Sequence, residues 1–211
     1  MFTKTIEALQ WRYATAEFDK QKKVSDSDLQ AILEAGNLMP SSFGLQPYQV
    51  IVVSDQSTKD ALAAVSSGNK FVASASHLLI FATSTKIDEA YISEYTSRIE
   101  TTRSLPKGTL DGFKKMMVDY LGGFSQADRT AWAKNQTYGV LGGITVAAST
   151  LGVDDHAYEW FDSGKYNEIL KLAPKNLTVS VCLALGHRAA SDATSQYKKV
   201  RKAFSVFTQK A

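Results

Sequence analysis

The stretch "MPSSFGLQPYQVIVV", residues 39–53, joins the end of a helix to an apolar strand. Pro40 ends the preceding helix because proline lacks the backbone N–H of a helical hydrogen bond. The run 48–53 is continuous and apolar, which predicts a strand buried on both faces. Between them lie small and turn-forming residues together with Phe43. A helix-to-strand loop with a core phenylalanine is one interpretation, and a loop that holds a flat ligand is the other.

Helices and strands alternate on both sides of this stretch. The hydrophobic periodicity predicts helices and buried strands, with caps at Ser25 and Ser125 and a stop at Gly152. The predicted helices are 2–13, 25–39, 57–68 and 125–152, the last interpreted as a buried core helix, and the further strands are 77–83 and 176–186. Residues 88–121 are helical but broken near 105–112. We therefore expect one domain, 1–211, of α+β or α/β class, with a mixed central sheet, helices on both faces and a helical excursion at about 86–124.

The charge of the chain is concentrated at its C-terminus. The 211 residues carry a formal charge of +3, yet residues 187–211 alone hold +5, which leaves −2 for the remainder. The densest part is "KKVRK", 198–202. A solvated charge run is one interpretation. A nucleic-acid surface is a weaker one, because the rest of the chain lacks a basic stripe, so we expect no nucleic-acid partner.

Several function classes lack their sequence signals. Residues 1–13 have no apolar core or cleavage site of a secretory signal, and the longest apolar run, 138–153, is shorter than a membrane helix requires. The single cysteine, Cys182, lies in an apolar run, which indicates a buried side chain. The three histidines lack ligand spacing, and neither a G-x-G-x-x-G turn after a strand nor a phosphate loop occurs. We expect a cytoplasmic protein without a metal site or a membrane partner.

An ordered set of motifs covers nearly the whole chain. "RYATAEF" begins at Arg12, and the P-[ST]-S-x-x-x-Q-P-[WY] pattern spans residues 40–48. Further matches are "ASH" at 75–77, Trp132 with Gln136, "LGV" followed by "EWFD" over 151–162, and Lys199 with Arg201. Each motif is weak alone, but together and in this order they resemble the FMN-dependent nitroreductase family.

This resemblance implies a cofactor, FMN, held by residues from both ends of the chain. Arg12, Lys199 and Arg201 would clamp its phosphate, and the loop at 41–44 would lie along its ring. The full set implied for the cofactor is Arg12, Tyr13, Ala14, Thr15, Ser41, Ser42, Phe43, Gly44, Asn69, Gln136, Tyr158, Glu159, Trp160, Lys199 and Arg201, with Phe43 and Phe113 at the substrate. Each of two residues has an alternative to a role at the cofactor. Gln136 would pack in a helix interface, and Glu159 would be an exposed residue that caps a helix.

The resemblance also implies an activity and an assembly. We expect an NAD(P)H-dependent oxidoreductase that reduces nitroaromatics, quinones or similar small acceptors by a ping-pong mechanism. The hydride would pass through flavin N5, so no side chain would be indispensable for that step. A homodimer is expected, with the C-terminal extension packed on the partner subunit. The alternative is a flavin-binding protein of the same fold with another reaction, or without NAD(P)H turnover. This sequence departs from the family pattern at Ala16, Gly44, Gly68 and 158–160. At Gly68 the family has Asn or Gln, and the nearest such residue here, Asn69, is one position later.

Overall fold

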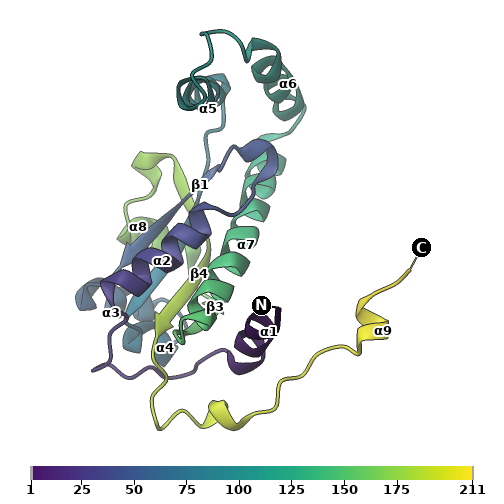
Figure 1. Ribbon diagram of the computed structural model, residues 1–211. Helices are drawn as coiled ribbons and strands as arrows, with labels where there is room; N and C mark the ends of the chain where they lie inside the picture. The colour runs from purple at the N-terminus through teal and green to yellow at the C-terminus, as the bar shows by residue number, and fades with distance from the viewer. Residues whose placement is uncertain (1, 211) are drawn as a thin grey trace.

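The computed structural model describes residues 2–210 and contains a four-stranded sheet at its centre (Figure 1). The strands are β1 (Tyr48–Val53), β2 (His77–Ser84), β3 (Asp154–Tyr158) and β4 (Leu177–Gly186), in the order β1-β2-β4-β3. All pairings between these strands are antiparallel. The parallel element is an isolated bridge between Ala14 and Asp155. The expected α+β architecture is confirmed, and three of the four strands lie where the sequence predicts them, but the sheet is antiparallel and not mixed.

The two apolar runs with the strongest strand character form the middle of the sheet. Leu78 to Ala82 in β2 and Val181 to Leu185 in β4 are almost completely buried. The prediction that β1 is buried on both faces is wrong, because β1 is an edge strand and Val52 remains 38% exposed. Sequence reasoning missed β3, since "DDHAY" is short and polar and therefore lacks an apolar strand pattern.

Helices cover both faces of the sheet, as predicted. One face packs against α2 (Asp26–Asn37) and α7 (Gln126–Thr150), whose Ile32 and Ile144 are fully buried against β2 and β4. The other face packs against α3 (Gln56–Ala64), α4 (Lys70–Ser74) and α8 (Ser163–Ile169). Sequence reasoning missed α4 and α8, because helices of two turns or fewer show little periodicity.

The predicted caps are confirmed at two helix starts. Ser25 Oγ accepts a hydrogen bond from Asp28 N, and Ser125 Oγ accepts one from Asp128 N, each at 3.1 Å. At the other end of α7, Gly152 has a φ of 73°, the left-handed conformation that ends many helices. Helix α1 (Phe2–Trp11) stops two residues earlier than predicted, so Arg12 and Tyr13 belong to the turn that follows it.

The long helix α7 is buried on one face only, which corrects the prediction of a buried core helix. Val140, Ile144 and Ala148 face the sheet, whereas Tyr138 is 44% exposed. At Gly142, the space that a Cβ atom would occupy has no neighbouring atom within 4 Å. The surface of α7 is therefore open around Tyr138 and Gly142. An apolar surface of this kind on a helix is typical of a contact face.

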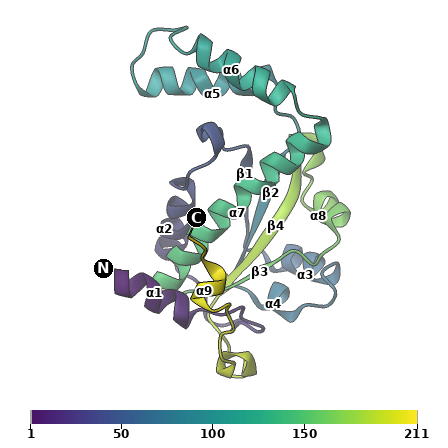
Figure 2. The same cartoon turned by 90° about the vertical axis from the view of Figure 1, so that its right-hand side faces the viewer.

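Residues between β2 and α7 form an arm of two helices that projects from one end of the sheet (Figure 2). These are α5 (Glu89–Thr102) and α6 (Asp111–Gly122), joined by the segment 103–110. Ile92, Met117 and Leu121 form a small core of their own with Leu45 from the loop before β1. The arm therefore packs directly on the loop that the sequence singled out.

The C-terminal residues extend away from the body (Figure 1). After the 3₁₀ helix η3 (Ala193–Gln196), the chain is extended until the short helix α9 (Phe204–Phe207). Val200, Phe204, Val206 and Phe207 are 69–83% exposed. Over residues 2–210, no helix has both the length and the apolar character needed to cross a membrane.

Candidate functional site

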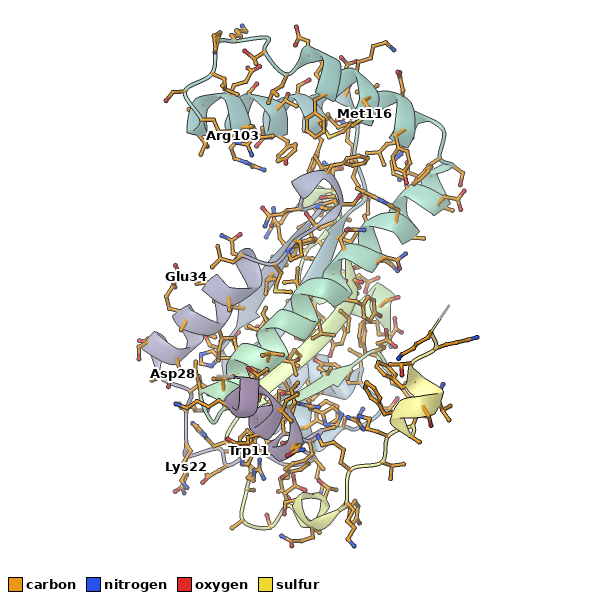
Figure 3. The ribbon with its side chains drawn as sticks, turned by 45° about the vertical axis from the view of Figure 1, so that its right-hand side comes forward. Trp11, Lys22, Asp28, Glu34, Arg103 and Met116 are labelled. Atoms are coloured by element: carbon orange, nitrogen blue, oxygen red, sulfur yellow. The ribbon has the colours of Figure 1, made fainter. Side chains whose placement is uncertain are left out.

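The predicted site residues lie in two groups at opposite ends of the molecule. One group surrounds the turn after α1, beside the label of Trp11 in Figure 3. The other lies under the helical arm, whose α6 carries the labelled Met116 in the same view. The first group consists of Arg12, Tyr13, Ala14, Thr15, Lys199 and Arg201, with Asn69 at the start of α4, and the second of Ser41, Ser42, Phe43, Gly44, Phe113 and Gln136. Tyr158, Glu159 and Trp160 lie at the end of β3, where Glu159 accepts from the Tyr138 hydroxyl of α7. One chain does not bring the two groups together.

A pocket of about 460 Å³ lies between the turn after α1 and the tail. Its lining joins residues that are nearly 190 positions apart in the sequence. It is lined by Gln10, Trp11, Arg12, Tyr13, Ala14, Thr194, Ser195, Tyr197, Lys198, Lys199 and Arg201. Three tail cations, Lys198, Lys199 and Arg201, therefore line one pocket, together with four hydroxyl-bearing residues, Tyr13, Thr194, Ser195 and Tyr197.

Arg12 forms a two-point ion pair at the wall of this pocket. Its Nε donates to Asp155 Oδ2 at 2.9 Å, and its Nη2 donates to Asp155 Oδ1 at 2.7 Å. The Asp155 side chain is completely buried, and that of Arg12 is 16% exposed. Burial raises the pKa of Asp155, and the Arg12 guanidinium opposes that rise. The pair fixes the plane of the guanidinium and leaves Nη1 uncommitted among the described residues.

Lys199 and Arg201 complete the cationic wall in different ways. Lys199 Nζ donates to the carbonyl of Leu9 at 2.8 Å and also to that of Arg12, so it caps the C-terminal end of α1. Burial lowers the pKa of Lys199, and the neighbouring charges of Arg12 and Arg201 lower it further. Within residues 2–210, Arg201 donates only to the carbonyl of its neighbour, Val200 O. With Lys198, four cations thus line the pocket, and a bound anion would reduce the repulsion between their charges.

Two carboxylates that sequence reasoning missed hold the turn in place. Asp155 binds Arg12, as described above. Asp192 Oδ2 accepts hydrogen bonds from the Tyr13 hydroxyl at 3.1 Å and from Ala16 N at 3.0 Å, while its Oδ1 accepts from Thr194 N. No pattern in the sequence links either aspartate to a turn more than 140 positions away, so only the fold could reveal them.

His156 supports the same turn from β3. Its Nδ1 lies 2.8 Å from the carbonyl oxygen of Thr15, which can only accept, so the neutral ring carries its proton on Nδ1. The ring stacks on Phe71 of α4 with centroids 3.8 Å apart. Burial lowers the pKa of His156. Asn69 lies at the start of α4, where its side chain makes no capping hydrogen bond.

The end of β3 carries one buried and two exposed residues. Tyr158 is buried, and its hydroxyl is 3.2 Å from that of Tyr166. Thr15 is completely buried, and its backbone is engaged, because its N–H donates to Asp155 O at 3.1 Å and its carbonyl accepts from His156 Nδ1. Glu159 is exposed and accepts from the Tyr138 hydroxyl, and Trp160 is 80% exposed.

The second group is centred on the 3₁₀ helix η1 (Ser42–Gly44). Gln136 of α7 accepts through Oε1 from Ser42 N at 2.8 Å, which ties the loop to the long helix. The Phe43 ring packs edge-to-face on two rings of α6, Tyr120 at 5.4 Å and Phe113 at 6.4 Å. The loop therefore presents backbone and hydroxyl groups beside an aromatic wall.

The chemistry of the two groups fits the two parts of a flavin mononucleotide, its phosphate and its ring. The cationic pocket offers uncommitted guanidinium donors for a phosphate dianion. The loop offers exposed Gly44 and partly exposed Ser41 and Ser42 beside aromatic rings, which suits a flat ring system. No comparable adenosine-binding glycine turn occurs in the sequence.

Comparison with known proteins gives consistent results. A family model described as the nitroreductase family matches residues 9–187. A Bacillus subtilis protein named "Putative NAD(P)H nitroreductase YfkO" is 34% identical over 197 residues, covering 88% of this chain and 89% of that protein. A Staphylococcus epidermidis relative with the same description is 36% identical over 194 residues, covering 87% of each chain.

Solved structures share the fold at low identity. A nitroreductase family protein from Streptococcus pneumoniae has a TM-score of 0.83 at 20% identity, covering 98% of this chain and 99% of that one. A protein from Exiguobacterium sibiricum, solved in complex with FMN, has a TM-score of 0.83 at 17% identity, covering 98% and 97%. These likenesses establish the same chain fold over nearly the full length.

Proposed function

Because the chain belongs to the nitroreductase family of oxidoreductases, we propose that it binds FMN and uses NADH or NADPH to reduce nitroaromatics, quinones or similar small acceptors. The observation that carries the proposal is the cationic pocket formed by Arg12, Lys199 and Arg201 from the two ends of the chain. Bound FMN would accept a hydride from the nicotinamide and pass it to the acceptor.

The chain's own residues bind and orient in this proposal. Arg12, fixed by Asp155, and Arg201 hold the phosphate, while Lys199 keeps the tail against α1. Tyr13 and Ala14 form the pocket wall beside Arg12, and Thr15 anchors that turn through its bonds to Asp155 and His156. The loop at Ser41 to Gly44, with Gln136 behind it, covers the opposite side. Proximity and orientation then lower the barrier without a side-chain proton donor, and the donor and acceptor use the same slot in turn.

A second copy of the chain completes the site in this proposal. Three observations support a homodimer: the two groups of site residues lie at opposite ends of one chain, α7 has an open face around Tyr138 and Gly142, and the apolar tail contacts little of its own body. In a two-fold dimer the pocket of one chain can face the loop of its partner. The tail, with Phe204 and Phe207 exposed, would pack on the partner subunit.

The absorption spectrum of the purified protein tests the proposed function. We expect a yellow protein that releases FMN, and not FAD, on heating. NADPH or NADH should bleach the colour without oxygen, and adding menadione should restore it. Initial rates at several donor concentrations should give parallel double-reciprocal lines. Recovery of FAD, or a protein that takes up no flavin, would contradict the proposal. A yellow protein that ignores both nicotinamides would favour the alternative of flavin binding without NAD(P)H turnover.

Substitutions in the C-terminal tail test the homodimer separately. Replacing Phe204 and Phe207 with serine should raise the dimer dissociation constant at least tenfold per ring, because burying a phenylalanine contributes about 1.5–3 kcal/mol. Sedimentation equilibrium should show twice the chain mass for the natural protein and a concentration-dependent mixture for the variant. Gln209→Ser, a polar change in the same segment, is the control. A mass of one chain at all concentrations would rule out the dimer.

A further inference from the structure

The loop between α2 and β1 is held in a conformation that its residues do not prefer. Phe43 and Gln46 have φ values of 58° and 47°, and Gly44 between them has 73°. Left-handed backbone is unfavourable for residues with a Cβ atom, particularly for a bulky phenylalanine. Such a conformation persists only where the surrounding structure imposes it. The loop's own bonds run from Gly44 N to Ser41 O, from Leu45 N to Ser42 O, from Gln46 N to Ser41 Oγ and from Tyr48 N to Gln46 O, and none of them reaches the carbonyl of Phe43.

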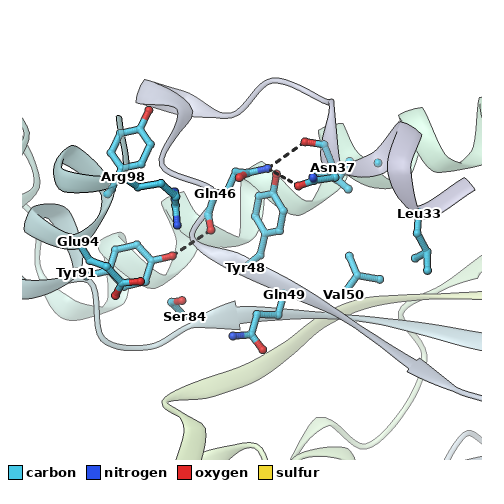
Figure 4. A pocket seen from close by; sticks show the side chains of 13 residues that line it. Leu33, Asn37, Gln46, Tyr48, Gln49, Val50, Ser84, Tyr91, Glu94 and Arg98 are labelled. Atoms are coloured by element: carbon cyan, nitrogen blue, oxygen red, sulfur yellow. Dashed lines mark hydrogen bonds between the residues drawn. The ribbon is translucent and has the colours of Figure 1, made fainter. Parts of the chain in front are cut away.

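Two tyrosines of α5 reach the carbonyl groups of these two strained residues. The Tyr95 hydroxyl donates to Phe43 O at 2.6 Å, and the Tyr91 hydroxyl donates to Gln46 O at 3.0 Å. Both hydroxyls lie one turn apart on the same face of α5, because residues four positions apart are neighbours on a helix. Figure 4 shows the Tyr91 bond at the edge of a cavity of about 650 Å³ between α2, β1 and α5.

Gly44 is required by the same contact. A Cβ atom at this position would lie 2.5 Å from Tyr95 Oη, closer than any allowed contact. The sequence alone indicates only that Gly44 frees the backbone. The structure adds that the Tyr95 hydroxyl occupies the space of a side chain here. Gly44 therefore leaves room for the Tyr95 hydroxyl, and through this hydroxyl α5 of the arm fixes the loop.

We propose that Tyr95, assisted by Tyr91, is a positioning residue that sets acceptor selectivity through Phe43. By fixing the carbonyl of Phe43, Tyr95 fixes the direction of its side chain and thus its edge-to-face packing on Tyr120 and Phe113. Phe43 of the loop and the two rings of α6 then form one aromatic wall in a fixed position. A wall in a fixed position favours the binding of flat, extended acceptors over that of small ones. The selectivity part of this inference rests on the proposed function, and the loop-locking part does not.

Hydrogen exchange measured by mass spectrometry or NMR tests the locking directly. Tyr95→Phe should speed exchange of the amides of Gly44, Leu45 and Gln46 about 3- to 10-fold, the loss of one net hydrogen bond. Tyr91→Phe should act mainly on Gln46 and less strongly. The matched control is Ser93→Ala, which removes a hydroxyl of the same helix that donates only within it, to Glu89 O at 2.7 Å. Unchanged exchange in both tyrosine variants would overturn the proposal.

Steady-state kinetics test the selectivity. For Tyr95→Phe, the ratio of kcat/KM for menadione to that for 1,4-benzoquinone should fall about 3- to 10-fold, through KM for menadione, with FMN retained, because the loss of one net hydrogen bond loosens the wall. Ser93→Ala should keep the natural ratio. Faster exchange with an unchanged ratio would overturn the role in selectivity. A protein without reductase activity would refute the proposed function, while the exchange result would still decide whether the tyrosines lock the loop.

Discussion

Replacement of Arg201 by glutamate is expected to raise the dissociation constant for FMN about a hundredfold or more. Arg12 is paired with Asp155 and Lys199 caps α1, so of these three cations Arg201 has the fewest bonds among the described residues. A hydrogen bond to a charged group contributes about 1.5–3 kcal/mol, and the glutamate adds repulsion of the phosphate. Fluorescence titration of the apoprotein with FMN measures the change.

The neighbouring residue provides a matched control for this charge reversal. Lys202→Glu changes the net charge equally, one position away, but Lys202 does not line the pocket. We expect less than about a threefold change for Lys202→Glu, because exposed charges contribute little and are screened by salt. Equal effects in the two variants would show that the tail acts only through its overall charge. A small effect in both would show that its cations are merely solvated.

Replacement of Arg12 by alanine is expected to lower the free energy of unfolding by about 3–5 kcal/mol, because it leaves the carboxylate of Asp155 buried without its partner. Urea denaturation of the apoprotein measures this loss. The loss should shrink as the pH falls, since a buried carboxyl with a raised pKa takes up a proton in the folded state before the unfolded one does.

Two further variants separate this ion pair from general effects of losing a charge. The double variant Arg12→Ala/Asp155→Ala should recover much of the stability, because neither charge then remains unpaired. Lys22→Ala breaks a surface pair with Asp19, whose side chains are 70% and 31% exposed, and should cost less than about 1 kcal/mol. A double variant no more stable than Arg12→Ala would show that the two residues are not coupled.

The positions of most elements followed from local signals in the sequence. Apolar runs located β2 and β4, and serine caps located the starts of α2 and α7, because these signals act over a few residues. The same local signals failed for β3, where the polar "DDHAY" pairs with β4 only because its partner strand is already buried. They also misjudged β1 and α7, since an apolar run does not reveal which of its faces another element covers.

The residues of the candidate site also divide into those that local sequence signals indicated and those that they did not. Sequence motifs pointed to Arg12, the loop at Ser41 to Gly44 and the tail cations, because residue type at a fixed spacing is visible in one chain. The sequence did not reveal Asp155 and Asp192, which hold the turn, or Tyr95, which fixes the loop. Each of these contacts joins segments 52 to 176 positions apart. Sequence by itself determined which groups can bind an anion and a flat ring, since that depends on their chemistry. Only the tertiary structure decided how those groups are oriented and that one chain places them at two separate ends, since that depends on long-range packing.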